Sequence, residues 1–130
     1  MKATQLPVFR KMYDLNLTLM RLVNKFPKQY KYNIGDKLIN TSLELFKYLF
    51  TANRVYYDKQ RRVNCIDEFL DGFDMLKVLI RLSNEERLFS IKDSANLALI
   101  TEDITKQING WRRKLSLGEK DEEENITNEI

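Results

Sequence analysis

The chain has 130 residues and a net charge of +3, and with 43% hydrophobic and 32% charged residues it suits one domain with a core of its own. Four Gly and two Pro supply few turns for an all-β fold, and the lack of His excludes Ser-His and Cys-His nucleophiles and histidine metal sites. Because no apolar run reaches the roughly 18 residues of a membrane span and no secretory signal pattern opens the sequence, we expect a soluble, cytoplasmic protein that does not enter membranes.

The first predicted helix begins near Leu6, with Pro7 in its opening turn, and ends before Phe26 and Pro27. Its apolar residues form one stripe at alternating spacings of four and three, and a second stripe beside it. The first stripe consists of Val8, Met12, Leu15, Leu19, Leu22 and Phe26, and the second of Phe9, Tyr13, Leu17, Met20 and Val23. Together they make an apolar arc that is wider than one partner helix can cover.

The second predicted helix follows the connection PKQYKYN, has Asn33 as its N-cap and runs to about Asn53. It also carries two adjacent apolar stripes, which are Leu38, Leu45, Leu49 and Ala52 on one side and Ile39, Leu43, Phe46 and Phe50 on the other. The charged connection RVYYDKQRR then leads to a third helix. In this connection, Tyr56 and Tyr57 are as well suited to packing over the end of a bundle as to stacking on nucleic-acid bases.

The third predicted helix, from about Val63 to Leu82, places two cations among apolar residues. On a wheel at roughly 100° per residue, Lys77 falls inside the apolar arc and Arg81 at its edge. The arc consists of Ile66, Phe69, Leu70, Phe73, Leu76 and Ile80, and the opposite side carries Met75, Leu79 and Leu82. A helix that is apolar nearly all round is buried on both faces, so we expect a second subunit to cover the outer one.

Two interpretations of the cations remain open. Asp74 lies three residues before Lys77 and can pair with it within the helix, while a long side chain can reach past apolar neighbours to water. Alternatively, Lys77 and Arg81 form a basic strip on an assembled surface or line a central passage, since burying them unpaired costs too much. For the pair taken together we favour the second interpretation.

Catalytic and metal-binding patterns are weak. Three acids on the third helix, Asp67, Asp71 and Asp74, share one side and could in principle hold a cation for a nuclease, but this spacing more often gives a solvated acidic stripe. The segment NIGDK lacks the spacing of a phosphate-binding Walker loop. Cys65 cannot form an internal disulfide and is expected to be a small core residue. We therefore predict no enzyme, no metal and no cofactor.

The fourth predicted helix opens with a capping box made by Ser90 and Asp93 and ends at Gly118. Its apolar positions, Leu97, Ile104, Ile108, Trp111 and Leu115, repeat at near-heptad intervals. Four helices of about 20 residues, each about 30 Å long, joined by short connections predict an all-α fold, an up-and-down antiparallel four-helix bundle over residues 1–117.

The last thirteen residues, 118–130, hold six acids and one Lys, a net charge of −5, and have no apolar period. We predict a disordered acidic tail there. The other 117 residues consequently carry a net charge of +8. A body with this excess of positive charge attracts polyanions, and nucleic acid is the leading candidate.

Four segments carry a family resemblance over about residues 6 to 115, namely VFRKMYDLNLTLMRLVNKFPK, IGDKLINTSLELFKYLFTAN, LKVLIRL and INGWRRKL. In their pattern and order the chain resembles the four-helix-bundle family that contains the accessory variability determinant of diversity-generating retroelements. The same family includes proteins encoded in intervening sequences of large-subunit ribosomal RNA genes.

The resemblance implies a homo-oligomeric, pentameric barrel with a basic surface and a central pore, binding to RNA and possibly DNA without strong sequence preference, association with a reverse transcriptase, and no catalytic activity. Two functional arginines of the family align with Lys77 and Arg81, so position 77 keeps the charge but not the bidentate fork. Other candidates for contacts with nucleic acid or a partner, each of which could also be a solvated charge, are Lys59, Arg61, Arg62, Arg112 and Arg113. We expect Trp111 to be packed rather than stacked on a base. The alternative is a structural oligomer of the intervening-sequence type without a polymerase partner.

Overall fold

A computed structural model describes residues 2–129 of the chain, and the side chains of residues 2–117. A 3-10 turn (Ala3–Gln5) precedes α1 (Pro7–Asn24), α2 (Lys28–Tyr30), a π-helical segment (Lys31–Gly35), α3 (Asp36–Arg54), α4 (Lys59–Glu85) and α5 (Ile91–Glu129). The described residues contain no β-strand, so the all-α class with four long helices is confirmed. The last helix was expected to end at Gly118, whereas α5 extends past this residue to Glu129. The prediction of a disordered tail falls on residues 118–130, whose side chains lie outside the described part.

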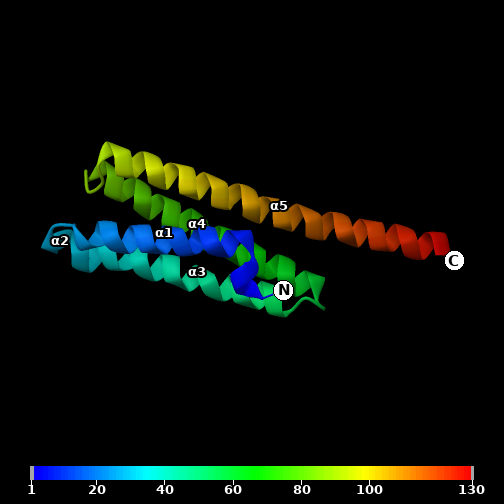
Figure 1. The fold of residues 1–130 in the computed structure, drawn as a ribbon. Coiled ribbons are helices and arrows are strands. Elements are labelled where there is room, and N and C mark those ends of the chain that lie inside the picture. Colours follow the sequence, from blue (N-terminus) through cyan, green and yellow to red (C-terminus); the bar gives the residue numbers. More distant parts are fainter. Residues whose placement is uncertain (1, 130) are drawn as a thin grey trace.

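The four long helices form a square in which α1 packs against α3 and α5, and α4 packs against the same two helices. Figure 1 shows each long helix running opposite to the one before it in the chain, the up-and-down arrangement of a bundle. Helices that are consecutive in the chain are therefore neighbours, and only the contact of α1 with α5 joins the first helix to the last. In the part of the chain that the structure describes, no helix combines the length and hydropathy that a membrane crossing needs.

The core is built from the apolar stripes that the sequence predicts. The first stripe of α1 is buried throughout, and it packs with side chains of the other three long helices that are almost fully enclosed, among them Leu38, Leu45, Leu49, Ile66, Phe69, Phe73, Leu76, Leu97, Ile104 and Ile108. Gly72 of α4 allows α3 to approach closely, because a Cβ atom there would lie 2.6 Å from Cδ2 of Leu45. Cys65 packs against the edge of this core, as expected.

The second apolar stripes of the first two predicted helices remain largely on the surface. Exposed side chains of α1 and α3 form what we call the α1–α3 face, which consists of Tyr13, Leu17, Met20, Leu43 and Phe50. The half-buried Phe9 contacts this face, with its ring centroid 6.4 Å from that of Tyr13 and 5.8 Å from that of Phe50. The prediction that the apolar arc of the first helix exceeds what one helix covers is therefore confirmed.

The outer side of α4 differs in one residue from the expected set. Met75 and Leu82 are exposed as predicted, but Leu79 is only 9% exposed and belongs to the core. Val78 is exposed beside them instead. The wheel placed Leu79 on the outside, whereas it lies close enough to the inward-facing Leu76 for the neighbouring helices to cover it. We call Met75, Val78 and Leu82 the α4 ridge.

Two predicted helix starts were wrong. Asn33 is not an N-cap but lies inside the π-helical segment, where its Nδ2 donates a 2.7 Å hydrogen bond to the carbonyl oxygen of Gln29 and its Oδ1 accepts from the N–H of Ile34. The helical chain is thus continuous from Lys28, directly after Pro27. The wider π turn accommodates a polar side chain that otherwise resembles a cap.

The third long helix begins at Lys59 rather than near Val63, because Asp58 caps it. The Oδ1 atom of Asp58 accepts a 3.0 Å hydrogen bond from the N–H of Arg61. At the start of α5, Oγ of Ser90 accepts a 3.0 Å hydrogen bond from the N–H of Asp93, which is one of the two hydrogen bonds of the predicted capping box.

Candidate nucleic-acid interface

Lys77 and Arg81 lie one turn apart on α4 and line a groove between α4 and α5. The groove encloses a volume of about 270 Å³. Its other lining residues are Ile80 and Asn84 of α4 and Ser94, Ala98 and Thr101 of α5. The walls of this α4–α5 groove therefore carry two cations, one amide and two hydroxyl groups.

Each of the two cations has a carboxylate partner within α4. Nζ of Lys77 lies 3.3 Å from Oδ1 of Asp74, and Nε of Arg81 lies 3.5 Å from Oε1 of Glu85. The Lys77 side chain is 42% exposed and that of Arg81 is 82% exposed, so neither charge is buried. Exposed pairs of this kind contribute about 0–1 kcal/mol, and a phosphate group can replace the carboxylate at little cost.

The intrahelical pair between Asp74 and Lys77, which the sequence left open, is therefore present. Nζ of Lys77 also lies 5.6 Å from the ring centroid of Phe73. The aliphatic stem of Lys77 thus crosses the apolar arc of α4 while its ammonium group reaches the surface. This accounts for a cation at a position that the helical wheel places among apolar residues.

Arg62 joins three helices at the far end of the bundle. Its Nε donates a 2.9 Å hydrogen bond to the carbonyl oxygen of Ala52 near the end of α3, and its guanidinium carbon lies 5.4 Å from the ring centroid of Trp111 in α5. Burial lowers the pKa of Arg62 from its ordinary value. We leave Arg62 out of the proposed interface because its guanidinium group is occupied by these contacts.

Arg112 forms a bidentate ion pair across the α4–α5 seam. Its Nε lies 2.8 Å from Oδ1 of Asp67 and its Nη2 lies 3.4 Å from Oδ2 of the same carboxylate. The hydrogen bond to Asp67 raises the pKa of Arg112. Asp67 therefore links α4 and α5 in this structure.

Among the side chains that the structure describes, no three Cys, Asp or Glu residues are placed to hold a metal ion.

The predicted site residues do not form one patch. Arg61 is exposed in the first turn of α4 and lies 16 residues before Lys77, a separation of about 24 Å along a helix. Lys59 is half-buried in the same turn, and Arg113 is exposed on α5. The structure thus brings Lys77 and Arg81 together in the groove and places the other candidates toward the opposite end of the bundle.

Tyr56 and Tyr57 are both more than two-thirds exposed, and their rings contact each other edge to face with centroids 5.6 Å apart. They do not pack over the end of the bundle, which was one of the two interpretations. The polar groove residues Asn84, Ser94 and Thr101 were not predicted from the sequence. No spacing along one helix relates α4 to α5, so only antiparallel packing across the short connection between them reveals these partners.

The fold and the groove define a small, all-helical four-helix-bundle protein. The model of the bAvd-like family matches residues 7–115, and the chain belongs to this family. A comparison with curated proteins gives no match. The family resemblance that the sequence segments indicated is therefore confirmed over almost the same residues. Membership implies the role of an accessory protein of a diversity-generating retroelement, and proteins of this family are generally non-catalytic.

Proposed function

We propose that the chain is a non-catalytic accessory subunit that binds nucleic acid and associates with the reverse transcriptase and template RNA of a diversity-generating retroelement during mutagenic retrohoming. The observation that carries this proposal is the α4–α5 groove. It holds Lys77 and Arg81, the residues that align with functional arginines of the family, at its surface. The net charge of +8 on residues 1–117 supports a polyanionic partner.

The chemistry of the groove suits phosphate groups better than base edges. Lys77 supplies a point charge and Arg81 a planar fork, while Ser94 offers a hydroxyl donor on the facing wall. The hydroxyl of Thr101 already donates a 3.1 Å hydrogen bond to the carbonyl oxygen of Ala98. Contacts to phosphate position a nucleic acid without reading its sequence. We therefore propose that this groove binds RNA, and possibly DNA, without strong sequence preference.

We further propose that the subunits assemble head to tail into a closed ring, of five chains by analogy with the family. The α1–α3 face and the α4 ridge are two different exposed apolar surfaces, so neither needs to pair with a copy of itself. An interface between two different surfaces generates a ring when the rotation closes. A ring repeats the groove once per chain and multiplies its positive field.

The decisive experiment compares Arg81→Glu with Arg21→Glu in RNA binding at several salt concentrations. Both changes alter the net charge equally, but Arg21 is an exposed residue of α1 outside the groove. We expect Arg81→Glu to weaken binding strongly and to reduce the slope of log affinity against log salt by about 0.7 for each lost phosphate contact on a single strand. Equal binding by the two variants would remove Arg81 from the interface and contradict the proposal.

A second measurement tests the partner. The reverse transcriptase encoded in the same retroelement is expected to copurify with the wild-type chain at low salt and to be lost with Lys77→Glu/Arg81→Glu. Light scattering must show the same mass for wild type and variant, so that loss of binding is not loss of assembly. An assembled chain that binds neither RNA nor the polymerase would instead fit the structural-oligomer alternative.

A further inference from the structure

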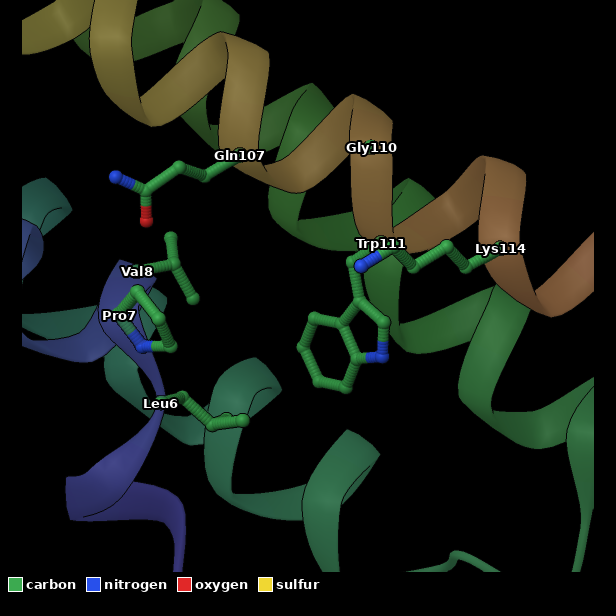
Figure 2. A pocket seen from close by; sticks show the side chains of 7 residues that line it. All are labelled: Leu6, Pro7, Val8, Gln107, Gly110, Trp111 and Lys114. Atoms are coloured by element: carbon green, nitrogen blue, oxygen red, sulfur yellow. The ribbon is translucent and has the colours of Figure 1, made fainter.

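An apolar pocket of about 400 Å³ lies on the α1 side of α5, whereas the α4–α5 groove lies on the other side of that helix. Figure 2 shows Gln107 and Trp111 reaching down from α5 on either side of the pocket, with Leu6, Pro7 and Val8 facing them from the start of α1. Gly110 and Lys114 complete the lining. The volume falls in the range of small-molecule sites in proteins.

Trp111 provides an aromatic wall that is already held in position. The guanidinium group of Arg62 contacts the indole from the α4 side, and Arg62 itself is anchored by its hydrogen bond to the carbonyl oxygen of Ala52. The remaining part of the ring lines the pocket. A flat ligand that stacks on Trp111 therefore finds an ordered surface, which reduces the entropic cost of binding.

Gln107 supplies a polar group without a partner. Among the described side chains, its Oε1 is a buried oxygen atom that accepts no hydrogen bond. A buried acceptor without a donor is unfavourable, and native structures usually satisfy such groups. The terminal torsion of Gln is broad, so a small rotation can turn this oxygen toward a donor in the pocket.

We propose that this pocket binds the base of a nucleotide, with the ring against Trp111, a base N–H donating to Oε1 of Gln107, and the phosphate near Lys114. A purely aliphatic ligand leaves the Gln107 oxygen unpaired and does not use the lysine at the rim. A free phosphate or sugar phosphate satisfies the lysine but has no flat apolar surface for the wall. A nucleotide matches the aromatic, hydrogen-bonding and charged parts of the lining together.

This inference goes beyond the proposed function, because the groove is assigned contacts to phosphate only. Trp111 is the one tryptophan of the chain, so the tryptophan fluorescence comes from this wall of the pocket. Titration of the full chain with the four nucleoside monophosphates is expected to quench or shift the emission in a saturable way. Ribose 5-phosphate, which lacks the base, is expected to leave it unchanged.

A blocking variant and a matched control complete the test. Apart from its chain neighbours and the backbone of its own helix, a Cβ atom at Gly110 would have no heavy atom within 4 Å, so Gly110→Phe places a ring in the pocket without removing a core contact. Asn109→Phe adds the same ring at an exposed neighbouring position outside the pocket. We expect Gly110→Phe to abolish the nucleotide response and Asn109→Phe to retain it. Gln107→Leu is expected to weaken binding by about tenfold, the effect of one lost hydrogen bond.

The proposal is overturned by no response to any nucleotide, by an equal response to ribose 5-phosphate, or by a full response in Gly110→Phe. Emission that changes with protein concentration but not with nucleotide would mean that a second chain fills the pocket, which also overturns it. Salt-dependent RNA binding that requires Arg81, together with no Trp111 response to any nucleotide, would refute this inference and preserve the proposed function. A Trp111 response without RNA binding would do the reverse.

Discussion

The hydroxyl group of Ser42 in α3 donates a 2.7 Å hydrogen bond to Oδ1 of Asn16 in α1, inside the apolar core. Nδ2 of Asn16 donates in turn to the carbonyl oxygen of Met12 at 2.8 Å. Ser42 is fully buried and Asn16 is 6% exposed. A buried polar pair whose groups are satisfied favours one alignment of the two helices over others, because a shift along the axis would leave both groups unpaired.

Removal of the Ser42 hydroxyl is expected to destabilise the bundle. Ser42→Ala leaves Oδ1 of Asn16 buried without a donor, which lowers the free energy of unfolding by about 1–3 kcal/mol. Urea denaturation measures this difference. The double variant Asn16→Leu/Ser42→Ala should lose less than the sum of the single changes, and additivity would contradict the coupling. Thr18→Ala, which removes an exposed hydroxyl bonded to its own helix, serves as the control.

Two glycine substitutions are expected to have opposite signs. Gly72→Ala gains about 1 kcal/mol in helix propensity but places a methyl group 2.6 Å from Cδ2 of the buried Leu45, and overpacking costs about 1–3 kcal/mol. Gly110→Ala gains the same propensity and meets no neighbour. Thermal unfolding should therefore show a lower midpoint for Gly72→Ala and a higher one for Gly110→Ala. A stabilised Gly72→Ala would show that Leu45 moves aside freely.

Arg87 ends α4 in a conformation that glycine prefers. Its φ is 59°, its N–H donates to the carbonyl oxygen of Asn84 and the N–H of Leu88 donates to that of Ser83, each at 3.0 Å. This is the pattern of a Schellman cap. We expect Arg87→Gly to raise the free energy of unfolding by about 1 kcal/mol, because it relieves the left-handed strain. Arg87→Ala keeps the strain and should give no such gain.

A charge in the α1–α3 face should dissociate the proposed ring. Leu43 is exposed in the single chain, so Leu43→Glu is tolerated by the bundle but places a carboxylate in an apolar subunit interface. We expect light scattering to give the mass of one chain, with unchanged helix content by circular dichroism. Asn40→Glu, at an exposed position of the same helix outside the α1–α3 face, should retain the wild-type mass. Assembly of Leu43→Glu would exclude this face from the interface.

Cys65 should react slowly with thiol reagents in the folded protein. Burial raises the pKa of its thiol, and the nearby Glu68 adds to the effect, so less thiolate is present at neutral pH than in an unfolded chain. The rate of alkylation is expected to keep rising with pH beyond the point at which an ordinary cysteine levels off. The same measurement in denaturant provides the control, and equal rates in both states would contradict the prediction.

The sequence predicted the features that depend on one helix at a time. Apolar periodicity identified the four long helices and the first stripe of α1, since burial follows from spacing on a single element. It misplaced Asn33 and the start of α4, because a polar residue before an apolar run can serve a cap or a π turn, and Asp58 lies in a charged connection. Likewise, periodicity placed Leu79 on the outer side of α4, although it is buried. Leu79 lies near the boundary of the two sides, where a small rotation of the helix about its axis decides whether a side chain is buried.

Features that depend on two helices could not be predicted in this way. The family alignment singled out Lys77 and Arg81, but Ser94 and Thr101 reach the same groove only through the packing of α4 on α5. Similarly, Trp111 packs against the core as expected, but the sequence did not show that its remaining surface contacts Arg62 on one side and lines a pocket on the other. A heptad position does not reveal which part of a large side chain its neighbours leave uncovered.

The contact between α1 and α5 has a consequence for how the bundle opens. This contact joins the first and last long helices of the chain. Each of the other three contacts joins two long helices that follow one another in the sequence. Closing a longer loop costs more entropy, about 0.6 kcal/mol for each doubling of its length. Amide hydrogens along this seam should therefore exchange with solvent sooner than those between α3 and α4. A molecule bound between Leu6 and Trp111 would contact both helices of this seam and would therefore slow the exchange of its amide hydrogens.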